Sequence, residues 1–156
     1  MIKIGDYLDR ETKRKIIKDS IRSGRIIHIR ALFNSGDKTD KLCLVICKDP
    51  FLFFTISKYV SNYVRNNPHR DALQIPIDNN DYDCIIHPSV INCIELHSAM
   101  ELDSAINQIA IKPQFYGARD YLKNSHKKEI IRKVLNSILY SERDKKIVVE
   151  GLSHEL

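Results

Sequence analysis

The chain has 156 residues, of which 43% are hydrophobic and 29% charged, and this profile predicts one soluble globular domain over residues 1–156. With 5 Gly, 5 Pro and no biased tract, the composition excludes collagen and low-complexity proteins. The longest apolar runs are far shorter than the roughly 20 residues of a membrane helix, and the N-terminus shows no signal-peptide pattern. We therefore expect a cytoplasmic protein with no membrane partner and with reduced cysteines.

The net charge of +5 is distributed unevenly along the chain. Residues 71–111 contain seven acidic residues and no Lys or Arg, whereas residues 112–146 contain ten basic and four acidic residues. This asymmetry predicts one face that attracts polyanions and another that repels them. Helices with solvated lysines explain either block as well, because lysine-rich surfaces need no ligand.

The first predicted element is a short amphipathic helix that begins after Asp9 and ends near Gly24. Its isoleucines recur at helical spacing on one face. The pattern then changes to β-forming residues over 25–33, followed by a strong turn signal at residues 34–37. A strand and an exposed loop are therefore expected in this part of the chain.

Two apolar β runs follow at residues 42–47 and 51–56, and a Lys-Asp-Pro sequence separates them. This spacing predicts an antiparallel hairpin. Residues 57–68 predict a helical turn or a mobile insert. Three further short strands are predicted after it, at residues 73–77, 84–86 and 90–96. Six short strands between residues 25 and 97 indicate a small, strongly bent antiparallel barrel.

The C-terminal part of the chain is predicted to be helical. Residues 98–111 fit either a helix or an irregular return segment. From Ser125 onward, an apolar stripe of 3.6-residue period with lysines opposite predicts a long basic helix that reaches about residue 146. The expected fold is therefore α+β, with a barrel core at about 24–99 and a C-terminal helical segment at about 100–146.

Most well-known functional motifs are missing. The sequence contains no GxGxxG, P-loop, GxSxG or HExxH pattern, which removes the usual support for dinucleotide, NTP, α/β-hydrolase and zincin functions. The cysteine spacing does not match a structural zinc site. We therefore expect no metal and no cofactor.

Polar residues bracket the predicted hairpin. Lys38 and Lys41 precede its first strand, while Thr55, Ser57 and Lys58 end its second strand. In an antiparallel hairpin the start of the first strand lies beside the end of the second, so an ammonium group and two hydroxyls should meet. Such a group can hold a phosphate. A solvated hairpin end without a function remains the alternative.

The order of these elements along the chain, rather than any single motif, resembles that of a known protein family. Its pieces are Gly24-Arg25-Ile26-Ile27, the loop 34–41, Leu42-Cys43-Leu44-Val45-Ile46, Phe53-Phe54-Thr55-Ile56-Ser57 and His87-Pro88-Ser89-Val90-Ile91. Over about residues 24–99 this order resembles the MazF and PemK family of bacterial toxins. Members of that family are endoribonucleases with an SH3-like barrel, so the resemblance implies this fold and this activity.

The resemblance also implies a reaction and its residues. It implies metal-independent transesterification of single-stranded RNA in a toxin-antitoxin system, with a cognate antitoxin and a possible homodimer as partners. Lys41 stands where the family has a catalytic Arg, and Ser57, or Thr55 in a shifted register, matches the family's Thr or Ser. Candidates for substrate contact are Arg25, His28, Lys38, Lys58, His69 and Arg70. Four of them, Arg25, His28, His69 and Arg70, are equally candidates for the general base.

Departures from the family pattern keep other functions open. Lys cannot supply the planar, bidentate fork of Arg, and Arg25 replaces the family's Asp after the opening glycine. A non-catalytic barrel is one alternative, acting as a gyrase-poison-like toxin or a regulatory module. Nucleic-acid binding by the basic C-terminal helix is another.

Overall fold

The computed structural model describes residues 9–32 and 38–153 and shows a mixed α+β fold built on a strongly curled antiparallel sheet. The strands are β1 (Arg25–Leu32), β2 (Lys38–Cys47), β3 (Leu52–Ser57), β4 (Gln74–Ile77), β5 (Ser89–His97) and β6 (Gly117–Tyr121). They lie in the order β4-β5-β3-β2-β1-β6, and every neighbouring pair is antiparallel. The expected α+β class is confirmed.

Six helices accompany the sheet among the described residues, namely α1 (Arg10–Ser20), α2 (Asn62–Arg65), α3 (Pro68–Asp71), α4 (Leu102–Ile111), α5 (Asn124–Leu135) and α6 (Glu142–Leu152). Several begin at side-chain caps that satisfy otherwise unpaired backbone N–H groups. Asp9 caps α1, Ser61 caps α2, Asn67 caps α3 and Ser141 caps α6. The expected N-terminal helix is confirmed, and residues 98–111 contain a helix rather than an irregular segment.

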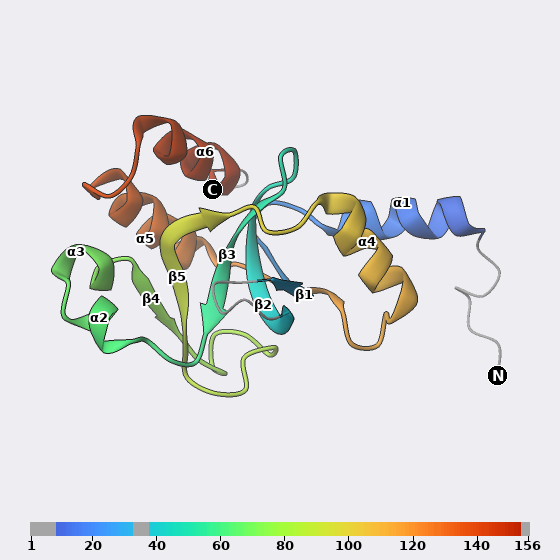
Figure 1. Cartoon of the computed structure of the whole chain (residues 1–156), viewed down its shortest axis with the longest axis horizontal. Helices are drawn as coiled ribbons and strands as arrows, with labels where there is room; N and C mark the ends of the chain where they lie inside the picture. The colour runs from blue at the N-terminus through green and yellow to red at the C-terminus, as the bar shows by residue number, and fades with distance from the viewer. Residues whose placement is uncertain (1–8, 33–37, 154–156) are drawn as a thin grey trace.

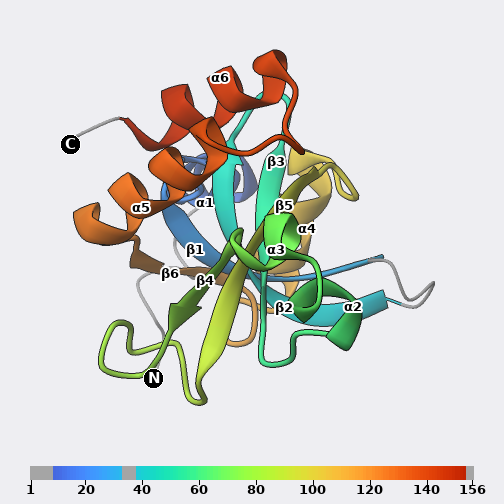
Figure 2. The same cartoon turned by 90° about the vertical axis from the view of Figure 1, so that its left-hand side faces the viewer.

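Helices cover both faces of the sheet (Figures 1 and 2). Because successive strand residues point to opposite faces, neighbouring residues of β1 and β2 enter different cores. Ile26 and Leu44 join a cluster with α5 and α6, whereas Ile27 and Val45 join a cluster with α4. This two-sided burial explains the apolar runs that the sequence shows in these strands.

The predicted hairpin is confirmed. β2 and β3 pair antiparallel, with Cys43 opposite Thr55 and Val45 opposite Phe53. The turn between them contains a cis peptide bond at Asp49–Pro50. The register places Lys41 and Ser57 at the open end of the hairpin, opposite the turn.

One predicted strand, at residues 84–86, is wrong. Instead of joining a ladder, the backbone N–H of Cys84 donates to the carboxylate of Asp120 at 3.2 Å. Ile85 is buried in the core, while Ile86 is 80% exposed. The sixth strand is β6, which lies beyond the predicted barrel core and pairs with β1. Its short polar sequence, Gly-Ala-Arg-Asp-Tyr, lacks an apolar alternation that would have indicated a strand.

The single long helix predicted over about 125–146 is also wrong, because the chain forms α5 and α6 with a connection between them. α5 ends at Leu135, where Asn136 is the C-cap residue. The Ser137 hydroxyl then accepts the backbone N–H of Leu139, and Ser141 starts α6. Ile138, which the helical stripe placed on the apolar face, is 73% exposed in the connection.

Two further sequence expectations concern membranes and cysteines. Within residues 9–32 and 38–153, no helix is long and apolar enough to cross a membrane. All four cysteines are free thiols, and Cys43 and Cys93 are buried. Burial raises the pKa of both buried thiols.

Candidate functional site

A hollow of about 570 Å³ lies at the open end of the β2–β3 hairpin, and we refer to it as the first hollow. Several polar and charged side chains line it together with an apolar floor. The position follows from the fold, because the start of β2 pairs with the end of β3 and with β1 at this end of the hairpin. The polar residues that line it include His28 on β1, Asp40 and Lys41 on β2, Ser57 and Lys58 at the end of β3, His87 before β5, and Ser89 at the start of β5.

Lys41 and Ser57 form the central contact of the first hollow. The Lys41 ammonium donates a hydrogen bond to the Ser57 hydroxyl oxygen at 3.3 Å. Both residues are half-buried, whereas Lys58 next to them is exposed. The hairpin thus brings a cation and a hydroxyl together as the sequence predicts, in a place that a phosphate oxygen can reach.

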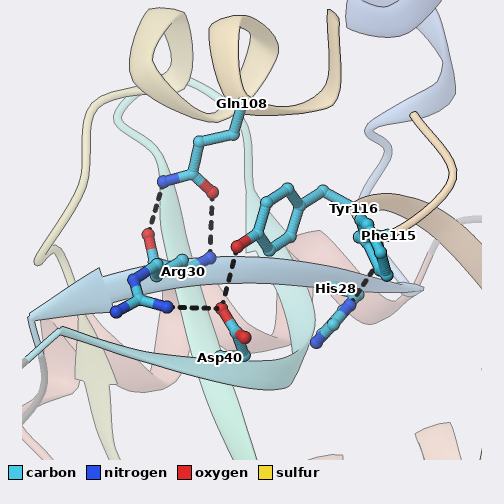
Figure 3. Close-up of polar contacts among 6 residues, drawn as sticks. All are labelled: His28, Arg30, Asp40, Gln108, Phe115 and Tyr116. Carbon is cyan, nitrogen blue, oxygen red and sulfur yellow. Dashed lines mark hydrogen bonds and ion pairs between the residues drawn. The ribbon is translucent and has the colours of Figure 1, made fainter. Parts of the chain in front are cut away.

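His28 is held in one orientation by the segment that follows α4. Its Nδ1 lies 2.5 Å from the carbonyl oxygen of Phe115, and its ring packs against Tyr116 at 5.4 Å between centroids (Figure 3). A carbonyl oxygen only accepts hydrogen bonds, so Nδ1 carries a proton and the lone pair of the matching neutral tautomer lies on Nε2. The ring is thereby prepared to accept a proton on its far side.

Asp40 lies beside Lys41 in a second polar network (Figure 3). The Tyr116 hydroxyl donates to Asp40 at 2.9 Å, and the Arg30 guanidinium lies 3.6 Å from the same carboxylate oxygen. The bond to Asp40 raises the pKa of Tyr116. Asp40 is therefore balanced by its own partners, and Tyr116 connects this network to His28.

The Gln108 side chain ties α4 to the same part of β1. Its amide oxygen accepts the backbone N–H of Arg30 at 2.9 Å, and its amide nitrogen donates to the Arg30 carbonyl at 2.5 Å (Figure 3). The amide thus replaces a strand neighbour at this residue. This two-point clamp fixes the strand that carries His28.

The structure brings some predicted residues together and leaves others apart. Lys41, Ser57, Lys58 and His28 line the first hollow. Thr55 does not, because it is only 4% exposed and pairs with Cys43 in the interior of the hairpin. The hydroxyl at the hairpin end is therefore that of Ser57.

Four predicted substrate contacts lie outside the first hollow. Arg25 contacts β6, where its guanidinium donates to Tyr121 at 2.9 Å. Lys38 is exposed at the far start of β2. His69 and Arg70 belong to α3, where Arg70 stacks on the Tyr63 ring at 4.7 Å.

Asp40, His87 and Ser89 line this hollow but were not among the site residues predicted from the sequence. His87 precedes β5, and Asp40 precedes Lys41 on β2. The sequence signal for His87 was its place beside Pro88 and Ser89 in the strand that resembles the toxin family. Asp40 gave no signal, because its partner Tyr116 is 76 residues away.

No match to a protein-family model, a curated protein or a solved structure was found. The chemistry of the site must therefore carry the functional argument. Within the described residues, no group of three or more His, Cys, Asp or Glu side chains is arranged to hold a metal ion. The first hollow offers one hydrogen-bonded ammonium–hydroxyl pair, a second lysine, two imidazoles, the Asp40 carboxylate and the Ser89 hydroxyl.

Proposed function

We propose that this protein is an endoribonuclease that cleaves single-stranded RNA by transesterification, using its own side chains in the first hollow. The observation that carries the proposal is the 3.3 Å contact between Lys41 and Ser57 in a hollow that two imidazoles also line. The curled antiparallel sheet supports the resemblance to the MazF and PemK toxins, whose barrel places catalytic groups at the corresponding strand ends.

In the proposed reaction, the 2′-oxygen of a ribose attacks the adjacent phosphorus and the bond from phosphorus to the 5′-oxygen breaks. The products are a 2′,3′-cyclic phosphate and a free 5′-hydroxyl. Negative charge grows on the phosphoryl oxygens in the transition state. Lys41 stabilises that charge, and the Ser57 hydroxyl donates to the same phosphate and orients it.

The reaction also needs one proton acceptor and one proton donor. His28 is the acceptor, because the Phe115 carbonyl holds the proton on Nδ1 and leaves Nε2 to take the proton of the 2′-hydroxyl. His87, the other imidazole of the first hollow, is assigned as the donor to the leaving 5′-oxygen. No added metal is required for either transfer.

The test is incubation of the purified protein with a long single-stranded RNA in EDTA, followed by analysis of the fragment ends. The proposal expects cleavage that resists EDTA and leaves 5′-hydroxyl ends. Lys41→Ala and Ser57→Ala should both slow this cleavage, and Lys41→Ala should slow it more. Lys38→Ala is the matched control, because Lys38 is on the same strand but does not line the first hollow.

Two outcomes would count against the proposal. Intact RNA with every protein would remove the catalytic assignment. RNA that is bound in a salt-dependent way but never cleaved would favour the alternative of a nucleic-acid-binding protein.

A toxin role adds partners to the proposal. An antitoxin would cover the first hollow and block RNA, and a second copy of the chain would extend the surface that RNA contacts. Induced expression in bacteria should arrest growth, and Lys41→Ala should relieve the arrest. If Lys41→Ala arrested growth as strongly as the unchanged protein, the toxicity would not depend on the first hollow.

A further inference from the structure

A second hollow of about 500 Å³ continues the first one across β1 and β2. The two hollows share His28, Leu42, Cys84 and Ile86 as lining residues. A ligand that occupies the first hollow therefore extends directly into the second. The second hollow differs in its polar residues, because it is lined by Asp83, Arg119 and Asp120 and contains no lysine.

The Asp120 carboxylate is fixed in place. One of its oxygens accepts the backbone N–H of Cys84 at 3.2 Å. Burial, together with a hydrogen bond from the thiol to Asp120, raises the pKa of the Cys84 thiol to about 11. A carboxylate has two acceptor oxygens with several lone pairs, so Asp120 keeps the capacity to accept N–H groups of a ligand.

The charge of the second hollow disfavours phosphate. Asp83 and Asp120 are both acidic, and the Arg119 guanidinium is already engaged, since it donates to the carbonyls of Phe115 at 2.8 Å and Ala118 at 3.2 Å. Phosphate should therefore occupy the first hollow, with its lysines. A neutral group that donates hydrogen bonds fits the second.

The apolar wall of the second hollow suits a flat ring. Ile86 is 80% exposed, which is unusual for a large aliphatic side chain, and Leu42 lies in the same lining. Unpaired bases of single-stranded RNA are recognised by such apolar contact together with hydrogen bonds to their edges. The pairing of an apolar wall with the fixed Asp120 carboxylate points to a nucleobase as the ligand.

We propose that the second hollow binds the nucleobase next to the scissile phosphate and selects guanine. This inference rests on the proposed function. Guanine presents two adjacent donors, N1–H and N2–H, which match the two oxygens of one carboxylate. Adenine and cytosine present one donor beside an acceptor, and uracil presents one donor between two carbonyls, so each would place a lone pair against Asp120 or Asp83.

The test separates base recognition from cleavage by using six-nucleotide RNAs in which every 2′-hydroxyl is methylated and cannot attack. Four fluorescent versions carry a uniform sequence except for one central base. Fluorescence anisotropy should show at least about tenfold tighter binding of the guanine version, as expected for a good bidentate pair. Equal affinity for all four, or no binding of any, would overturn the proposal.

Substitutions of Asp120 and Asp83 test whether these residues cause the preference for guanine. Asp120→Asn replaces one acceptor oxygen with a donor and should abolish the guanine preference, and Asp83→Asn should reduce it. Asp71→Asn is the control, because Asp71 is exposed on α3 and does not line the second hollow. An unchanged preference in both Asp120→Asn and Asp83→Asn would overturn the assignment.

A variant of the apolar wall tests the proposal independently, in case Asp120→Asn does not fold. Ile86→Asn alters an exposed side chain and should weaken binding of all four oligonucleotides while keeping guanine first. Unchanged affinities in this variant would contradict the apolar wall. Guanine-selective binding without cleavage of the unmethylated RNA would keep a guanine site in the second hollow but remove the proposed function, and with it the place of that site beside a scissile phosphate. Cleavage without any base preference would keep the proposed function and overturn the guanine site.

Discussion

The two ends of the β2–β3 hairpin use the same pair of strands for different purposes. At the turn end, α6 approaches so closely that a methyl group on Gly151 would lie 2.1 Å from the Ile46 carbonyl oxygen. The Ser23 hydroxyl donates to that same oxygen at 2.9 Å. At the open end, Lys41 and Ser57 meet in a hollow that solvent can enter.

This difference teaches how the fold separates stability from chemistry. Near the turn end, α6 packs so tightly against Ile46 that a methyl group on Gly151 has no room, although Asp49 and Pro50 in the turn itself are exposed and line another hollow. The open end carries the first hollow, whose polar groups are available to a ligand. Substitutions at the turn end should therefore change stability, and those at the open end should change activity.

The largest expected effect is that of Lys41→Ala on RNA cleavage. Loss of a cation aimed at transition-state charge should lower the cleavage rate by about 10²- to 10³-fold. The melting temperature should stay within about 2 °C, because one half-exposed lysine contributes little to stability. Single-turnover cleavage and thermal unfolding measure both quantities. A large fall in melting temperature would mean that the open end of the hairpin also determines stability.

The next effect is that of Gly151→Ala on stability. Because the added methyl group meets backbone rather than a flexible side chain, overpacking should cost about 3 kcal/mol. For a chain of this size that lowers the melting temperature by roughly 6–12 °C. The cleavage rate well below the melting temperature should not change. Glu150→Ala, at the exposed neighbouring position, should leave the melting temperature almost unaltered.

A smaller effect compares the two hydroxyls of β3. Ser57→Ala should slow cleavage by about tenfold, since it removes one hydrogen bond to the phosphate. Thr55→Val keeps the shape of a side chain that is buried in the hairpin, so cleavage should persist. Cleavage rates of both variants, measured with the same RNA, show which of the two hydroxyls the reaction uses. A greater loss in Thr55→Val than in Ser57→Ala would mean that the buried hydroxyl serves the reaction.

The strands around this hairpin could be predicted from the sequence because their signals are local. Apolar runs and a Lys-Asp-Pro turn indicate β2 and β3, and antiparallel pairing then places Lys41 beside Ser57. β6 could not be found this way. It is short and polar, and it becomes a strand because β1 offers it a partner.

The rest of the site depends on contacts between distant segments. His28 is oriented by Phe115, which is 87 residues away, and no spacing rule connects the two. The same holds for Gln108, whose amide clamps Arg30 across 78 residues. The run at residues 84–86 shows the opposite failure, since its apolar sequence looks like a strand but its backbone bonds to Asp120 instead.

The last prediction concerns a charge interaction that crosses the boundary between the two ends. His97 lies opposite Phe53 in the sheet and stacks on its ring at 6.0 Å. Burial lowers the pKa of His97, the nearby Glu95 raises it in part, and the cation of Lys41 lowers it further. The folded state therefore favours the neutral imidazole.

In the unfolded chain the His97 side chain has the ordinary histidine pKa of about 6.5, which is higher than its pKa in the folded state. The folded state therefore loses stability as the pH falls below about 6.5, because the unfolded chain then binds the proton more readily. Lys41→Ala should move the pKa of His97 upward and shrink this loss. An NMR titration of the His97 ring measures the shift directly. Lys38→Ala should leave the titration as it is. An unchanged His97 titration in Lys41→Ala would show that the Lys41 charge does not influence the pKa of His97.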